Sequence, residues 1–106
     1  MQEERRSGAR VRPLRPVLVE YHAFRPYLRD IGIGGAFIDD PRPLPLGHKV
    51  QLKVWLDDHA PITVEAVVRR VEDWKGMGVE FLRMSKADSA RLRAFLISST
   101  ADRQAS

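Results

Sequence analysis

Two short stretches near the N-terminus carry residues that could bind an anionic ligand, and the first is "RSGAR" (6–10). It places Arg6 and Arg10 four residues apart, and in an extended chain such side chains point to the same side, about 13 Å from each other. A guanidinium group can hold a phosphate or a guanine edge with two parallel hydrogen bonds. Because the residues between them are small, the two groups could converge on one ligand. From the spacing alone, a solvated basic tail is the simpler interpretation.

The second stretch, "DIGIGG" (30–35), contains Asp30 and three of the seven glycines of the chain. Glycine weakens a regular strand by about 0.5–1 kcal/mol relative to alanine, so its repeated use needs a reason. One interpretation is a bulged hairpin corner, in which Gly34 and Gly35 allow the tight turn into the strand. The other is a loop whose bare backbone N–H groups meet a ligand while Asp30 accepts hydrogen bonds, for example from a purine. No GK[ST] motif and no helix pattern follow, which excludes a P-loop and a dinucleotide-binding fingerprint.

The composition favours an anionic partner. The formal net charge is +4 at pH 7, and most of the 18 basic residues are arginine. A GC-rich genome would produce the same bias without a functional cause. Cysteine is absent, which excludes disulfides and thiolate metal sites. No apolar run approaches the roughly 20 residues of a membrane span and no signal peptide is recognisable, so we expect a cytoplasmic protein without membrane insertion.

Neither a metal centre nor an active site is indicated. The three histidines, His22, His48 and His59, lie in separate segments without the spacing of metal ligands. No serine forms a recognisable nucleophile–base set with them. We therefore expect a protein that is not an enzyme and that carries no metal and no cofactor.

The elements that must position the two stretches are predicted to be short β-strands. The pattern is clearest in "KVQLKVWL" (49–56), where apolar and polar residues alternate as in a half-buried antiparallel strand. In the longest predicted strand, 62–72, the alternation slips near Val67 and Val68, which predicts a bulge. Six such strands at a spacing of roughly ten residues, with turn residues such as Asp39–Asp40 between them, predict a small six-stranded antiparallel β-barrel.

A helix is predicted after the last strand, from about 86 to 98. Ser85 followed by Asp88 resembles a capping box at its start. Apolar residues then recur at helical spacing, at Leu92, Phe95 and Leu96. This face would cover one end of the barrel.

The chain is therefore expected to have three parts. Residues 1–16 are polar and rich in arginine, so they are predicted to form a flexible arm without a core of its own. Residues 17–98 would form the barrel and its C-terminal helix. Residues 99–106 would be a frayed tail.

The two stretches, in this order and before this strand pattern, resemble the two-part signature of PilZ domains. That signature is R-x-x-x-R in the arm and D/N-x-S-x-x-G at the start of a strand. The later segments "PLPLGHKVQLKVWL", "ITVEAVVRRVED", "GMGVEFLRMS" and "ADSARLRAFL" also resemble the family, so the resemblance covers about residues 4 to 98. It implies a six-stranded antiparallel barrel from a bacterium. Many PilZ domains are receptors for cyclic di-GMP, a second messenger with two guanines and two phosphates.

The resemblance also implies roles for single residues of this chain. Arg6 and Arg10 would bind phosphates and guanine edges. Asp30 would bind a guanine, and Gly35 would let the loop turn against the ligand. Arg5, just before the motif, could add a further basic contact, which is compatible with one or two ligands per domain.

One position departs from the family pattern, because Gly32 stands where the family has serine. The missing hydroxyl removes a hydrogen bond that contributes about 0.5–1.5 kcal/mol net, and up to about 3 kcal/mol where a buried group stays unpaired. The affinity would fall by a few-fold to roughly a hundredfold. The arginines and the acid remain, and charge-assisted hydrogen bonds are the stronger ones. We therefore expect binding through Gly32 and its neighbours to be weakened and not abolished.

Three functions are compatible with the sequence. In the first, the protein is a cyclic di-GMP receptor whose arm folds over the ligand and presents a new face to an unidentified downstream protein. In the second, it is a degenerate PilZ-like adaptor that binds proteins without the nucleotide. In the third, the basic arm binds nucleic acids in general, with a steep dependence on salt. We do not expect DNA or RNA as the partner.

Overall fold

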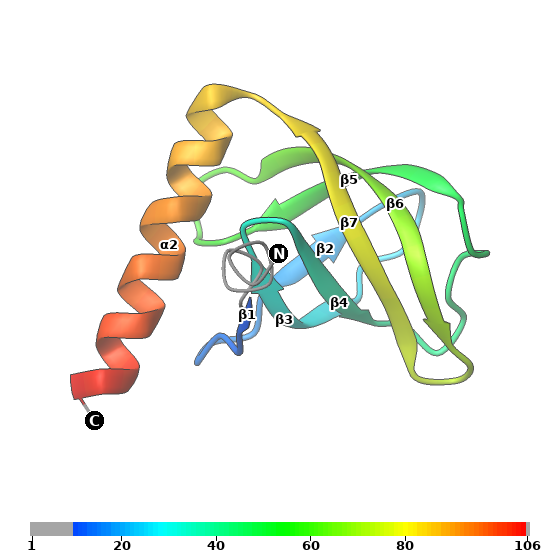
Figure 1. Ribbon diagram of the computed structural model, residues 1–106, viewed down its shortest axis with the longest axis horizontal. Coiled ribbons are helices and arrows are strands. Elements are labelled where there is room, and N and C mark those ends of the chain that lie inside the picture. The colour runs from blue at the N-terminus through cyan, green and yellow to red at the C-terminus, as the bar shows by residue number, and fades with distance from the viewer. Residues whose placement is uncertain (1–9, 106) are drawn as a thin grey trace, which may run out of the picture.

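The computed structural model describes residues 10–105, with side chains described for residues 10–99 (Figure 1). Seven strands precede one C-terminal helix. In chain order they are β1 (Arg10–Val11), β2 (Leu18–Glu20), β3 (Tyr27–Gly32), β4 (Gly35–Asp39), β5 (Lys49–Trp55), β6 (Ile62–Glu72), β7 (Gly76–Met84) and α2 (Lys86–Ala105).

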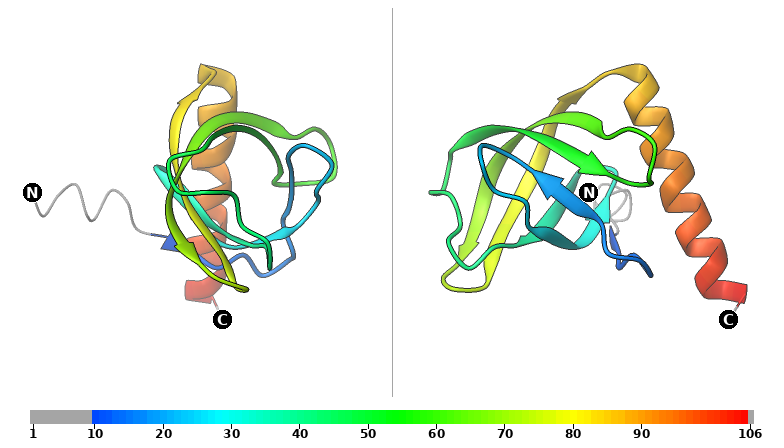
Figure 2. Two further views of the ribbon diagram at one scale, coloured as in Figure 1. Left: turned by 90° about the vertical axis from the view of Figure 1, so that its right-hand side faces the viewer. Right: turned by 180° about the vertical axis from the view of Figure 1, so that it is seen from behind.

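Six of the strands close into a barrel. The order in the sheet is β1-β3-β2-β5-β6-β7-β4. β3 is also paired with β4, the last strand in this order, and this pairing closes the ring from β3 to β4. All the pairings are antiparallel, and the strands surround a common interior (Figure 2). β1 lies outside this ring, against β3. The prediction of a six-stranded antiparallel barrel is confirmed.

Alternation decides which side chains fill the barrel. In β5, Val50, Leu52 and Val54 are buried, while Gln51 and Lys53 between them are exposed. The same period holds in β6, where Ile62 and every second residue to Val68 belong to the core. Successive side chains of a strand point to opposite faces, so the inward residues of all six strands meet in one apolar core.

The helix covers one end of this core. Ser85 Oγ accepts a hydrogen bond from the Asp88 backbone N–H at 3.0 Å, as expected for an N-cap. The Asp88 carboxylate does not complete the capping box, because it accepts from the Thr63 N–H of β6 at 3.0 Å. Leu92 is fully buried in the core, and Phe95 packs against its edge.

Both borders of the barrel region differ from the prediction. Arg10 and Val11, assigned to the free arm, form β1, because the edge of β3 offers unpaired backbone groups there. Residues 1–9 lie outside the described residues. The helix does not end at 98 but continues to Ala105, so the residues predicted as a frayed tail are helical. No glycine or proline follows residue 86, and a helix that is already formed adds a hydrogen bond with each further residue.

The strands contain bulges, of which only one was predicted. The register of β6 against β7 shifts between Val68 and Arg70, next to the slip seen in the sequence, and also between Glu65 and Ala66. A further shift, between Leu28 and Asp30, interrupts the pairing of β3 with β4. Within the described part of the chain, no helix is long and apolar enough to cross a bilayer.

Candidate ligand-binding site

The pairing of β1 with β3 brings the two sequence motifs together. Arg10 lies directly opposite Gly32 in this ladder. Its Nη1 is 3.1 Å from Asp30 Oδ1, and the two side chains are 37% and 24% exposed. A guanidinium donor and a carboxylate acceptor therefore stand side by side on the outer face of the barrel. Arg5 and Arg6 lie outside the described residues.

Gly35 follows at the start of β4 and lies under Arg10. A Cβ at this position would be 2.4 Å from the carbonyl oxygen of Val79 and 3.2 Å from Arg10 Nη2. Only glycine fits at Gly35, because the first of these contacts is to backbone that cannot move aside. Gly34 is different, since a Cβ there would meet no atom within 4 Å. The requirement for glycine therefore holds at Gly35, whereas nothing packs against Gly34.

A row of four residues extends this face across four strands. Asp30 of β3 is paired with Phe37 of β4, Phe37 with Gly78 of β7, and Gly78 with Arg70 of β6. Side chains paired across strands point to the same face, so the row lies on the outside of the barrel.

Phe37 is buried on this outer face without belonging to the barrel core. Only 1% of its surface is exposed. The guanidinium carbons of Arg29 and Arg70 lie 4.2 Å and 5.6 Å from the centre of its ring, which are cation–π distances. A Cβ on Gly76 would come within 2.6 Å of the ring, so this glycine makes room for it. Phe37 thereby holds Arg29 and Arg70 against its ring on this outer face.

A hollow of about 460 Å³ lies next to Arg10. Its walls carry three arginines and one acid, and its floor contains two glycines; the lining residues are Arg10, Gly34, Arg69, Arg70, Gly78, Val79 and Glu80. Arg69 Nε is 2.8 Å from Glu80 Oε1. Arg10 and Arg70 are also paired with carboxylates, those of Asp30 and Glu72, so each guanidinium group of the hollow lies beside an acceptor.

The sequence motifs did not identify the far wall of this hollow, which consists of Arg69, Arg70 and Glu80. The only signal was the slip in alternation near Val67 and Val68. A bulge places two successive residues on the same face of a strand, and here it turns both arginines outward.

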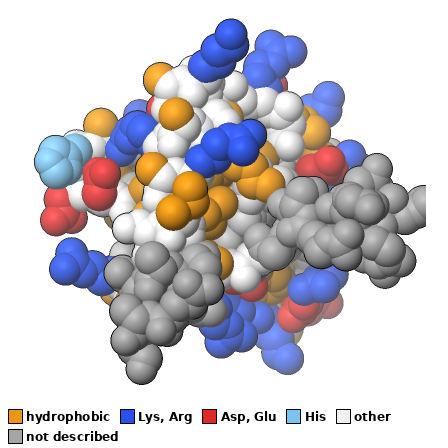
Figure 3. Space-filling view, turned by 60° about the vertical axis from the view of Figure 1, so that its left-hand side comes forward, with side chains coloured by type: hydrophobic (Ala, Val, Ile, Leu, Met, Phe, Trp, Pro, Cys, Tyr) orange, Lys and Arg blue, Asp and Glu red, His pale blue; other side chains and the backbone are white. Residues whose placement is uncertain are grey.

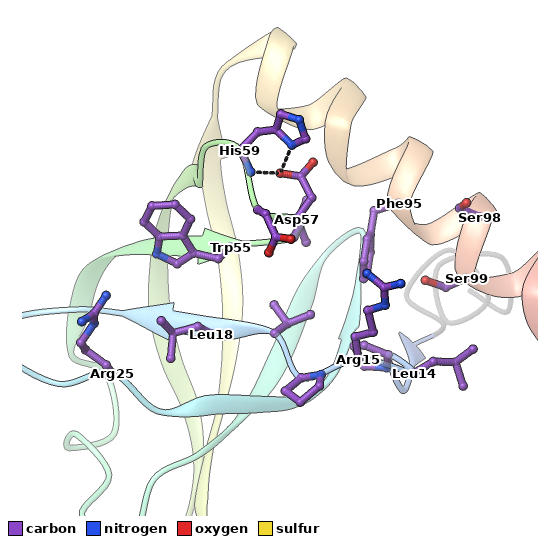
Figure 4. Close-up of a pocket in the computed structure, with 15 residues that line it drawn as sticks. Leu14, Arg15, Leu18, Arg25, Trp55, Asp57, His59, Phe95, Ser98 and Ser99 are labelled. Atoms are coloured by element: carbon purple, nitrogen blue, oxygen red, sulfur yellow. Dashed lines mark hydrogen bonds and ion pairs between the residues drawn. The ribbon is translucent and has the colours of Figure 1, made fainter.

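A second and larger hollow, of about 860 Å³, lies between the segment before β2, the end of β5 and α2. Phe95 projects from α2 toward Leu14 and Arg15 (Figure 4). Asp57 Oδ1 accepts a hydrogen bond from the His59 backbone N–H at 2.9 Å and lies 3.6 Å from His59 Nδ1. The hydrogen bond from the His59 backbone N–H lowers the pKa of the Asp57 carboxyl, and the charge of the nearby Arg91 lowers it further. The residues that line this larger hollow also include Trp55. Its Nε1 is buried without a hydrogen-bond partner among the described residues.

The side of the molecule that carries α2 shows exposed hydrophobic side chains near its centre, with Lys and Arg around them (Figure 3). Leu14 and Ile97 are each 71% exposed. Among the residues that the structure describes, no three histidine, aspartate or glutamate side chains are grouped as metal ligands.

Comparisons with known proteins agree with this geometry. A family model of the PilZ domain matches residues 4–98. The fold is similar to that of the Bacillus subtilis inhibitor of motility (MotI/DgrA), with a TM-score of 0.75 and 23% identity over 92% of this chain. It is also similar to YcgR from Escherichia coli in complex with c-di-GMP, with a TM-score of 0.72 and 20% identity over 95% of this chain. The likeness spans 52% of the first chain and 47% of the second, about half of each. A search of curated proteins gave no match.

Proposed function

The chain belongs to the PilZ domain family, and from this premise we propose that it is a receptor for cyclic di-GMP that acts on a downstream protein. One observation carries the proposal: Arg10 and Asp30, which come from the two separate motifs, meet at 3.1 Å on one outer face. The similarity of the fold to YcgR, whose structure contains c-di-GMP, supports the choice of ligand. The role is one of binding, without catalysis.

The chemistry of the site matches the ligand. Asp30 has two carboxylate oxygens, which can accept hydrogen bonds from the N1–H and N2–H groups of a guanine. Arg10 can donate to a phosphate or to the O6 and N7 edge of the base. Gly35 lets Arg10 lie close to the backbone, because a Cβ there would be 3.2 Å from Arg10 Nη2. Arg5 and Arg6, at the sequence positions before Arg10, would add positive charge for the phosphates.

The relay to a partner would use the segment that follows β1. This segment continues from Val11 to Val17, and from Pro13 onward it lines the larger hollow beside α2. A ligand that holds Arg10 against Asp30 would also hold this segment against the barrel. The surface around the hollow would then differ between the free and the bound protein, and a partner could distinguish the two.

A second candidate function follows from Gly32. This residue lies opposite Arg10 and supplies no hydroxyl where the family has serine. If the missing hydrogen bond lowers the affinity so far that cyclic di-GMP does not bind at cellular concentrations, the protein is an adaptor that binds proteins without the nucleotide. The unidentified partner is then the only regulator.

Isothermal titration calorimetry with cyclic di-GMP tests the proposal. The wild-type protein should show saturable binding, and the Arg6→Ala/Arg10→Ala variant should lose it, because charge-assisted hydrogen bonds contribute about 1.5–3 kcal/mol each. Arg93→Ala is the matched control, since it removes an exposed arginine from α2, away from the site.

Two outcomes would contradict the receptor proposal. One is the absence of heat at high micromolar ligand from a protein whose circular dichroism shows it to be folded; the adaptor is then the remaining candidate. The other is binding that cyclic di-AMP displaces equally well or that falls steeply with salt for any nucleotide, which indicates recognition of phosphate alone.

A further inference from the structure

The hollow beside Arg10 contains a second pair of an arginine and a carboxylate. In the first pair, Arg10 Nη1 lies 3.1 Å from Asp30 Oδ1. In the second, Arg69 Nε lies 2.8 Å from Glu80 Oε1, with side-chain exposures of 62% and 51%. Each pair offers guanidinium donors next to carboxylate acceptors on the same outer face.

The surface between the two pairs is lined by small residues. Gly34 and Gly78 belong to the lining of the hollow. Gly34 is exposed, and a Cβ there would meet no atom within 4 Å, so a ligand can approach the backbone at this point. Gly78 is itself buried, between Arg70 and Phe37 in the row of paired residues.

Arg70 stands at the edge of this surface in a fixed place. Its guanidinium carbon is 5.6 Å from the centre of the Phe37 ring, and its Nη2 is 2.9 Å from Glu72 Oε2. Its side chain is still 66% exposed. An arginine held in this way can stack on a base or meet a phosphate with little loss of conformational freedom.

The two carboxylates lie close enough to meet one ligand with two bases. Asp30 lies on β3 and Glu80 on β7, with only β4 between them, because Glu80 is paired with Gly35 of β4 and β4 is paired with β3. Two interstrand spacings amount to about 10 Å across the sheet. A guanine presents N1–H and N2–H donors together with O6 and N7 acceptors, which match a carboxylate beside a guanidinium group.

We propose that Arg69 and Glu80, supported by Arg70, form a second guanine-recognition site, so that the two pairs together hold the two bases of one cyclic di-GMP. This inference rests on the proposed function and deepens it, because it assigns the far half of the ligand to the β6 bulge. The bulge is essential in this arrangement, since without it Arg69 and Arg70 would point to opposite faces.

The test is calorimetric titration of the full chain with cyclic di-GMP and with the mixed cyclic GMP–AMP. Arg69→Ala, Arg70→Ala and Glu80→Gln should each weaken binding of cyclic di-GMP by about tenfold or more. The matched controls are Arg83→Ala and Glu65→Gln, whose exposed pair lies on the same two strands, with 3.8 Å between Arg83 Nε and Glu65 Oε1.

The mixed ligand gives a readout that a loss of charge alone would not change. Wild-type protein should prefer cyclic di-GMP to cyclic GMP–AMP, because both sites select guanine. Glu80→Gln should reduce this preference by several-fold, whereas Glu65→Gln should leave it as it is.

The possible failures are distinguishable. If the wild-type protein does not bind cyclic di-GMP, the proposed function and this inference fall together. If the wild-type protein binds and Arg10→Ala loses affinity, but the Arg69, Arg70 and Glu80 variants behave like the Arg83 and Glu65 controls, the receptor function stands and the second site is overturned.

Discussion

Arg10 of β1 and Asp30 of β3 form an ion pair across twenty residues of sequence, with 3.1 Å between Nη1 and Oδ1. Both side chains are partly exposed, and exposed ion pairs contribute only about 0–1 kcal/mol to stability. The pair is therefore a weak reason for β1 to dock on the barrel. Under the proposed function, the pair would place a donor and an acceptor side by side before the ligand arrives, which would lower the cost of ordering them on binding.

The planar fork of Arg10 should matter beyond its charge. Arg10→Lys keeps the positive charge but loses the parallel donors that a phosphate or a guanine edge requires. We expect its affinity for cyclic di-GMP to fall by roughly tenfold, with a larger loss in Arg10→Ala. Calorimetry measures both values. Equal affinity of Arg10→Lys and the wild type would show that Arg10 acts only as a point charge.

Gly35 and Gly34 form a matched pair for a test of close packing. Gly35→Ala places a methyl group 2.4 Å from the carbonyl oxygen of Val79, whereas Gly34→Ala meets no atom within 4 Å. Overpacking of this kind destabilises a protein by about 1–3 kcal/mol. In urea denaturation, Gly35→Ala should lose stability of this size and Gly34→Ala should resemble the wild type. Comparable stability of the two variants would contradict the close approach of β4 and β7 at this point.

Gly32→Ser should strengthen ligand binding, because it supplies the hydroxyl present in the family pattern. One added hydrogen bond contributes about 0.5–1.5 kcal/mol, or roughly two- to tenfold in affinity. Gly32→Ala is the control, since it adds the Cβ without the hydroxyl. Titration of both variants gives their affinities, and their melting temperatures are measured alongside. A gain in affinity for Gly32→Ser alone indicates the added hydrogen bond. A gain in both variants would assign the effect to the backbone.

Tyr21 should make stability depend on alkaline pH. Its buried hydroxyl donates a hydrogen bond to the Asp40 carboxylate. Burial, followed by this hydrogen bond, raises the pKa of Tyr21 well above its ordinary value of 10.0. The unfolded chain therefore loses this proton first as the pH rises, so the contribution of Tyr21 is complete below about pH 10 and declines above it.

Tyr21→Phe isolates this contribution. At pH 7 the variant should be about 1–3 kcal/mol less stable, because Asp40 loses one buried donor and keeps the Arg42 N–H at 2.9 Å. Above pH 10 the difference from the wild type should shrink. Denaturation curves at pH 7 and pH 10.5 measure the effect. A constant difference at the two pH values would contradict the raised pKa of Tyr21.

Local patterns in the sequence were sufficient for most of the barrel and part of the site. Alternation in β5 and β6 specifies the inward residues, because the side-chain period of a strand is two whatever the neighbouring strands are. The positions of Asp30 and Gly35 in the "DIGIGG" motif likewise follow from the sequence, and the structure places them on one face with Arg10. The helix start at Ser85 was visible because an N-cap is a local feature.

Asp40 shows where local reasoning fails. It was assigned to a turn, and its Oδ1 does accept the Arg42 N–H as in a turn. The residue is nevertheless only 7% exposed, because Tyr21 from the end of β2 reaches its carboxylate. Nothing near Asp40 in the sequence indicates this partner.

The sequence by itself determined the strand faces, the start of the helix and the positions of the two motifs, since each depends on residues a few positions apart. Only the tertiary structure decided that β1 docks beside β3 and that the β6 bulge turns Arg69 and Arg70 toward the same hollow. These relations depend on strand order and register, which are set by the closure of the barrel around its whole core. The far wall of the site could not be read from a motif, because β6 reaches Asp30 only through two intervening strands.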